Sequence, residues 1–128
     1  METLMRIGAF AKRFGVPQST VRYYIQRGIL IPEKRNGQHL FPESCINDME
    51  RVMEFKSLLF SLDNILELLT LHRKFNLSQK SDVDAYMRLL IQHKDYLQEE
   101  LSTAVKQEER LRQMEAMVRS ITASSSVQ

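Results

Sequence analysis

The sequence predicts a mainly α-helical protein with a small N-terminal head of short helices and one β-hairpin, followed by a single long helix. In residues 1–71, apolar residues recur at helical spacing within short segments that Gly and Pro separate. One Asn-Gly pair lies between two short extended segments, as in a tight hairpin turn. Residues 82–121 contain neither Gly nor Pro. We expect a head at 1–71, a hinge at 72–81, a coiled-coil helix at 82–121 and a disordered tail at 122–128.

The first expected helix covers residues 7–14 and has one apolar face. Its apolar residues follow the spacing i, i+3, i+4, i+7, which places them on one side of a helix. Gly15 follows, and a glycine in the left-handed conformation commonly ends a helix. The residues of this face are Ile7, Phe10, Ala11 and Phe14.

The second expected helix runs from about residue 17 to 27 and divides into a buried side and an exposed side. Pro17 suits its first turn, and Gly28 is a natural stop. At 100° per residue, three apolar or aromatic residues share one arc, and four polar ones lie opposite. The first group is Val21, Tyr24 and Ile25; the second is Ser19, Arg22, Tyr23 and Gln26.

Residues 29–41 are expected to form a β-hairpin. The Asn36-Gly37 pair suits a tight turn, because both residues tolerate the positive φ that such a turn requires. Lys34 and Arg35 precede the turn and make the approach to it basic.

Two further helices are expected before the hinge. One opens at Pro42 and Glu43, and the next opens after Ser61, whose hydroxyl suits an N-cap. The expected apolar positions of the first are Ile46, Met49, Val52, Met53, Phe55 and Leu59. Those of the second are Leu62, Ile65, Leu66, Leu68 and Leu69.

The long helix carries a heptad repeat that predicts pairing with a second copy. Apolar residues recur seven apart, although Lys94, Glu108 and Glu115 interrupt the other seam position. Such a helix would be about 57 Å long, too long to cover its apolar stripe against so small a head. The expected dimerisation residues are Met87, Leu90, Leu97, Leu101, Ala104, Leu111, Met114 and Val118.

Composition narrows the function classes. Residues 1–40 contain seven Lys and Arg and two acidic residues, the sign of charge that approaches phosphates. The single cysteine, Cys45, cannot form an intrachain disulfide or a cysteine-based metal cluster. There is no signal peptide or membrane-length apolar run, so a soluble cytoplasmic protein without a membrane partner is expected. We also expect no cofactor, no metal site and no enzyme activity, because no catalytic constellation or phosphate-binding glycine loop is present.

The order of these elements and several short motifs resemble the MerR family of transcription regulators. The matching residues are Ile7-Gly8-Ala9-Phe10-Ala11-Lys12, Gly15-Val16, Thr20-Val21-Arg22-Tyr23-Tyr24, Gly28-Ile29-Leu30, Asn36-Gly37, Phe41 and Phe60-Ser61-Leu62-Asp63-Asn64-Ile65. The resemblance covers about residues 5–70. The tail matches no motif of the family and is similar only in being a long helix. The resemblance implies a winged helix-turn-helix head followed by a long dimerisation helix that pairs as an antiparallel coiled coil.

The resemblance also implies a function. The second helix would enter the major groove of double-stranded DNA, the hairpin would be the wing, and a homodimer would bind a palindromic promoter operator. It would bend and untwist the DNA so that RNA polymerase can engage. The residues it implies at the DNA are Gln18, Ser19, Arg22, Tyr23, Lys34, Arg35, Asn36, Gly37 and His39.

The chain departs from the family pattern at a few positions. Gln38-His39 follow the turn where Tyr-Arg is usual, and the segment before Asn36 is one residue short. Leu59 stands where the family has Gly, and Pro17 and Pro42 replace the usual Ser or Thr caps.

Alternatives remain at this stage. Arg22, Lys34, Arg35 and the first-helix residues Lys12 and Arg13 could be ordinary solvated charges. Tyr24 is expected in the core, and Cys45 as a small semi-buried residue. The chain could instead be a coiled-coil interaction module without sequence-specific DNA binding. The sequence does not distinguish an activator from a repressor, nor does it identify an effector.

Overall fold

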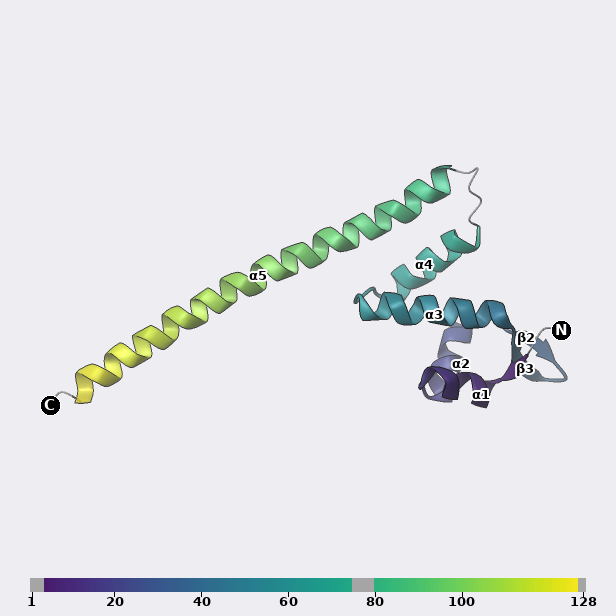
Figure 1. Ribbon diagram of the computed structural model, residues 1–128, viewed down its shortest axis with the longest axis horizontal. Helices are drawn as coiled ribbons and strands as arrows, with labels where there is room; N and C mark the ends of the chain where they lie inside the picture. Colours follow the sequence, from purple (N-terminus) through teal and green to yellow (C-terminus); the bar gives the residue numbers. More distant parts are fainter. Residues whose placement is uncertain (1–3, 75–79, 127–128) are drawn as a thin grey trace. The chain divides into compact units, whose positions relative to one another are not determined.

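The computed structural model describes residues 4–74 and 80–126. The described residues divide into two compact units between Leu89 and Leu90. The mainly α-helical class is confirmed (Figure 1). The elements are β1 (Met5–Arg6), α1 (Ile7–Phe14), α2 (Gln18–Gln26), β2 (Glu33–Arg35), β3 (Gln38–Phe41), α3 (Glu43–Ser57), α4 (Leu62–Arg73) and α5 (Lys80–Ser126).

The turn between α1 and α2 forms as predicted. Gly15 ends α1 with φ 64°, and its N–H bonds back to the carbonyls of Ala11 and Lys12. Of the three residues predicted on the buried side of α2, Val21 and Tyr24 are 0% and 2% exposed, and Ile25 is half-buried. The polar arc of α2 therefore faces solvent.

The sheet has three antiparallel strands in the order β1-β3-β2, whereas the predicted hairpin has two. In the hairpin turn, Asn36 and Gly37 have φ values of 51° and 76°, both in the left-handed region. The additional strand β1 pairs Met5 with Phe41 and Arg6 with Leu40. Because β1 is only two residues long, it carries no alternation pattern that could have predicted it.

An aromatic pair joins the sheet to the helices. Phe10 of α1 stacks on Phe41 of β3 with ring centroids 4.3 Å apart, and both are fully buried. This contact fixes the base of the wing against α1. Other core residues from α2, α3 and α4 are Val21, Tyr24, Cys45, Met49, Val52, Phe55, Ile65, Leu68 and Leu69.

Two arginines connect the helices of the head. Arg73, near the end of α4, donates to the carbonyls of Gly28 and Ile29 and pairs with Asp48 of α3 at 3.0 Å. Arg27, at the end of α2, pairs with Asp63 of α4. These contacts link the end of α2 and the loop after it to α3 and α4.

Two expected core positions are wrong, one within α3 and one between α3 and α4. Leu59 is 73% exposed and Met53 is 40% exposed, so neither belongs to the core. Leu59 adopts φ 65°, because the chain reverses here between two helices and the left-handed turn directs its side chain to solvent. The N-cap is as predicted, since the Ser61 hydroxyl accepts from the backbone N–H of Asn64 at 3.1 Å.

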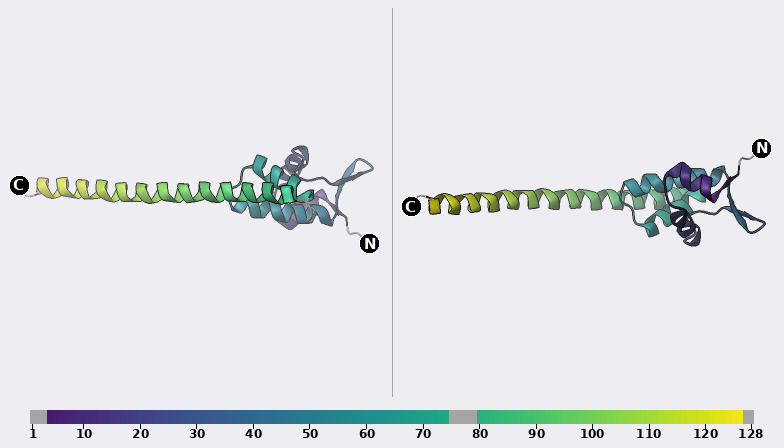
Figure 2. Two further views of the ribbon diagram at one scale, coloured as in Figure 1. Left: turned by 90° about the horizontal axis from the view of Figure 1, so that it is seen from above. Right: turned by 90° about the horizontal axis from the view of Figure 1, so that it is seen from below.

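The long helix α5 is continuous in every view (Figure 2). It begins at Lys80 rather than residue 82, and α4 runs on to Arg73, so both ends of the expected hinge at 72–81 are helical. Residues 75–79 of that hinge lie outside the described residues. The helix also continues to Ser126, within the expected disordered tail, where the hydroxyls of Thr122 and Ser125 bond to carbonyls of the preceding turn.

No helix in the described part of the chain combines the length and the apolar character needed to cross a membrane.

Candidate nucleic-acid interface

The exposed face of α2 presents a set of polar side chains. Gln18, Ser19 and Arg22 are exposed, and Tyr23 is 43% exposed. The Arg22 Nη2 donates to Gln18 Oε1 at 3.1 Å, one helical turn away. Gly8 of α1 lies next to this pair, since a Cβ at that position would come 3.4 Å from Gln18 Nε2. Gln18 therefore holds the Arg22 guanidinium in place from the start of the helix.

Arg27 orients the other exposed side chain of α2. Its Nη1 donates to the Tyr23 hydroxyl at 3.3 Å, and its guanidinium carbon lies 5.9 Å from the centre of the Tyr23 ring. Its second partner, Asp63, anchors it to α4. Arg27 was not among the residues predicted at the site. The i, i+4 spacing of Tyr23 and Arg27 was the available signal.

The wing carries its charges on both faces. Lys34 and His39 are opposite each other in the β2–β3 pairing, so they share one face, and Arg35 and Gln38 share the other. Arg35 forms an exposed ion pair with Glu33 at 2.8 Å. An exposed pair of this kind contributes at most about 1 kcal/mol, so it leaves Arg35 able to exchange Glu33 for another anion. The predicted residues Lys34, Arg35, Asn36 and Gly37 are all exposed.

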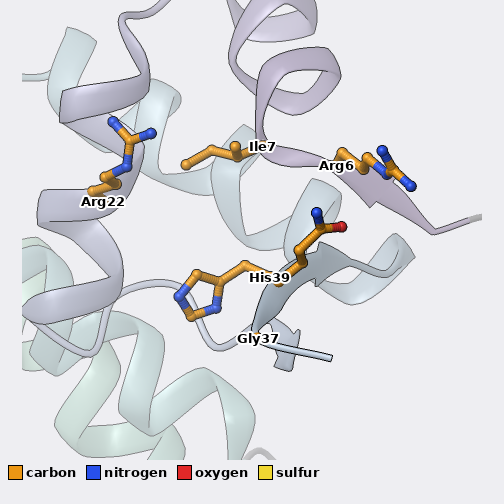
Figure 3. A pocket seen from close by; sticks show the side chains of 6 residues that line it. Arg6, Ile7, Arg22, Gly37 and His39 are labelled. Carbon is orange, nitrogen blue, oxygen red and sulfur yellow. The ribbon is translucent and has the colours of Figure 1, made fainter. Parts of the chain in front are cut away.

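A pocket of about 260 Å³ brings α2 and the wing together (Figure 3). The His39 ring and the Ile7 side chain both point toward the helix that carries Arg22. The Nδ1 atom of His39 is buried and has no hydrogen-bond partner in the described structure. The lining residues are Arg6, Ile7, Arg22, Gly37, Gln38 and His39.

Three of the six residues that line the pocket, Arg22, Gly37 and His39, were predicted at the site, and Arg6, Ile7 and Gln38 were not. Arg6 and Ile7 reach it because β1 pairs with β3. No sequence signal pointed to them, since only this long-range strand pairing places the start of the chain beside the wing.

Helix ends add positive potential on the same side of the head. Neither α1 nor α2 has an acidic residue in its first turn or a side chain that caps its N-terminus. The partial positive charge of each helix start is therefore uncompensated, which favours approach of an anion. Lys12 and Arg13 are exposed on α1 but do not line the pocket.

Cys45 lies in the core of the head. Its side chain is 1% exposed, more buried than the semi-buried position expected. Burial raises the pKa of the Cys45 thiol to about 11, so the neutral thiol predominates at ordinary pH. Among the described residues, no group of three or more His, Cys, Asp or Glu is placed to hold a metal ion.

The α5 helix exposes apolar side chains along its length. Of the predicted dimerisation residues, Met87, Leu101, Ala104, Leu111, Met114 and Val118 are exposed, and Leu90 and Leu97 are partly exposed. Further exposed apolar residues, which the heptad pattern did not include, are Ile91, Tyr96, Val105, Met117 and Ile121.

Comparisons with known proteins identify one family of regulatory proteins. Residues 5–71 match the family described as "MerR HTH family regulatory protein". The chain is 31% identical over 91 residues to a protein named HTH-type transcriptional regulator ZntR homolog from Haemophilus influenzae, covering 70% of this chain and 64% of that protein. It is 39% identical over 69 residues to the mercuric resistance operon regulatory protein of Pseudomonas fluorescens, covering 52% of this chain and 48% of that one.

The chain thus spans between about half and just under two thirds of the length of these curated relatives. A solved structure of a MerR family transcriptional regulator from Bacillus cereus superimposes with a TM-score of 0.66. It is 22% identical in sequence, and the match covers 88% of this chain and 80% of that one. This structural likeness supports the fold.

Proposed function

Because the chain belongs to the MerR family of helix-turn-helix regulatory proteins, we propose that it is a sequence-specific DNA-binding transcriptional regulator. In this proposal a homodimer binds a palindromic promoter operator and distorts it, and RNA polymerase is a further partner. The relatives it matches are named as regulators and not as enzymes. No effector is assigned.

One observation carries the proposal: the exposed polar face of α2 and the wing converge on one pocket. Arg22 can contact two acceptors of a guanine edge at once, and Gln18 and Ser19 can donate or accept at neighbouring bases. Tyr23 and Lys34 carry donors suited to backbone phosphates, which fix the position of a protein on a duplex. A helix for the bases beside a wing for the phosphates is the arrangement that sequence-specific binding requires.

The α5 helix supports the homodimer. Its apolar side chains are exposed within the described chain, and a second copy of the same helix would cover them. Two heads related by a two-fold axis read two identical half-sites, which is why a palindromic operator accompanies a dimer.

A footprint on DNA upstream of the gene for this protein tests the proposal. We expect a protected palindrome whose half-sites are separated by about one helical turn, roughly 34 Å, or a multiple of it. Binding should weaken steeply with salt, because phosphate contacts release counterions.

The same experiment separates the alternative function. A chain that forms stable dimers but protects no DNA at low salt would be a coiled-coil interaction module, and the proposal would fail. Genome-wide footprinting would then show no enrichment at promoters.

A further inference from the structure

The pocket between α1, α2 and the wing has the chemistry of an anion site. Its six lining residues include two arginines and no acid. Arg22 lies on the α2 side, and Arg6 lies on the β1 side with its side chain extending outward (Figure 3). The net positive charge of the lining residues favours an anion at this pocket.

Neither arginine is committed to a carboxylate within the described residues. Arg22 donates to the neutral oxygen of Gln18, and Arg6 forms no side-chain hydrogen bond or ion pair there. Arg27, Arg35, Arg73 and Arg112, by contrast, each pair with an acid. Arg13 and Arg51 of the head also form no ion pair within the described residues, but neither lines the pocket. Arg6 and Arg22 are therefore the two arginines without an acidic partner that lie at this pocket.

The His39 ring adds an unsatisfied polar group to the same wall. A buried nitrogen without a hydrogen-bond partner carries a desolvation cost that a ligand can remove. Rotation about the Cβ–Cγ bond exchanges the two edges of the imidazole, so the ring can present a nitrogen to the pocket. Ile7 supplies an apolar surface beside these polar groups.

We infer that this pocket holds a segment of the DNA sugar–phosphate backbone and that Arg6 is a phosphate-binding residue. Arg22, whose guanidinium is proposed to contact a base, borders the segment on the side of α2, and His39 borders it on the side of the wing. Arg6 closes the outer rim, and Ile7 packs against the sugar. The inference rests on the proposed function, and it adds a residue and a position for the backbone that the function alone does not specify.

The geometry favours backbone phosphate over a free phosphate compound. The pocket opens between the two elements proposed to contact a duplex, and a backbone that crosses it would touch both. It is not enclosed by a helix or loop that would shield a small ligand from water. The two arginines that line the pocket present their charge at its rim, where an extended polyanion can bind across it.

The salt dependence of binding to a mixed-sequence DNA duplex tests the role of Arg6. For Arg6→Ala, the slope of log affinity against log salt should fall by about 0.9 for each pocket of the dimer. Arg6→Lys should keep the slope, because the charge is retained, although the affinity is expected to fall. Arg119→Ala is the matched control, since Arg119 is an exposed arginine far along α5.

A second variant keeps the test independent of any effect of Arg6 on folding. Gln38→Glu places a carboxylate in the pocket and should weaken duplex binding through repulsion. Gln38 is exposed, and the helical content measured by circular dichroism should be unchanged. If the slopes of Arg6→Ala and Arg119→Ala are equal and Gln38→Glu binds like the parent, the inference is overturned while the proposed function stands. If the parent protein binds no duplex, the proposed function itself fails.

Nuclear magnetic resonance of the His39 ring distinguishes the source of the phosphate. Its signals should move on addition of the duplex and stay in place in inorganic phosphate at matched ionic strength. Movement with both ligands still supports a backbone site. A ring that responds to inorganic phosphate and not to the duplex would assign the pocket to a small phosphorylated ligand and overturn the inference.

Discussion

At the scale of single residues, Arg22 is the side chain on which base recognition most depends in the proposed function. It is exposed, it lies at the centre of the polar face of α2, and Gln18 holds its guanidinium. The interaction with Gln18 reduces the number of conformations that must be lost when the arginine binds a base.

Replacement of Arg22 by Ala is expected to weaken operator binding by about 1–3 kcal/mol, which corresponds to roughly fivefold to 150-fold in affinity. Titration of the footprinted operator by fluorescence anisotropy measures this loss. Arg110→Ala, an exposed arginine of α5, serves as the control. Equal affinities for the two variants would remove Arg22 from the interface.

Cys45 leads to a prediction about reactivity. Burial raises the pKa of its thiol to about 11, so about one molecule in a thousand carries the thiolate at pH 8. A thiol reagent at pH 8 should therefore label the folded protein slowly and the unfolded protein quickly. Rapid labelling of the folded chain, monitored by mass spectrometry, would contradict the buried position.

The same shift has a consequence for stability. The folded protein holds the Cys45 proton more tightly than the unfolded chain does. The thiol therefore makes its full contribution to the free energy of unfolding at pH values below the pKa that it has in the unfolded chain. This contribution is lost as pH rises toward 11. Cys45→Ala should lack this part of the alkaline decline in the free energy of unfolding.

At the scale of elements, the turn between α3 and α4 contains a strained residue. Leu59 adopts φ 65°, a conformation that costs a residue with a side chain about 1–2 kcal/mol and costs glycine little. Its side chain is 73% exposed, so little apolar burial offsets that cost.

Leu59→Gly is therefore expected to stabilise the head. The relief of strain exceeds the extra entropy of a glycine in the unfolded chain, and the net gain should be about 0.5–1 kcal/mol. Chemical denaturation measures it. Leu58→Gly is the matched control and should destabilise, because Leu58 has φ −92° and gains nothing from glycine. A loss of stability in Leu59→Gly would show that its side chain contributes more than its conformation costs.

The polar residues of the α5 seam make a prediction about pairing. In an antiparallel pair centred near Leu101, Lys94 of one copy lies within about one helical turn of Glu108 of the other, because both positions are seven residues from the centre. Opposite charges at these interruptions would favour this orientation over others.

Lys94→Glu should accordingly weaken the dimer, and the double change Lys94→Glu with Glu108→Lys should restore it. Sedimentation equilibrium measures both dissociation constants. Glu109→Lys, one position away from the seam, is the control. A parallel pair would bring Lys94 next to its own counterpart, and Lys94→Glu combined with Glu108→Lys would then give no restoration.

At the scale of the whole molecule, the proposed function couples pairing of α5 to binding by the head. Leu101→Glu should separate the copies, because it places two carboxylates where the apolar stripe of α5 in one copy packs against the same stripe in the other. The head of this variant should keep its fold, since no residue described in α5 is buried. Operator affinity should fall by at least an order of magnitude, because two linked heads bind with a high effective concentration. Full operator affinity in a variant shown to be monomeric would exclude a requirement for the dimer.

Much of this molecule follows from the sequence alone, because the controlling interactions are local. Gly15 ends α1, Asn36 and Gly37 form the hairpin turn, and Ser61 caps α4, each through contacts within a few residues. Helical spacing likewise separates the buried Tyr24 from the exposed Tyr23.

Only the tertiary structure decided the features that depend on residues far apart in the chain. The pairing of β1 with β3 brings Arg6 beside the wing, and the α4 helix supplies Asp63 to the arginine that orients Tyr23. Leu59 resembled a core position because periodicity shows which face of a helix a residue lies on and not where the helix ends. Local chemistry sets helices and turns, whereas the position of one element against another depends on packing that no short window of sequence contains.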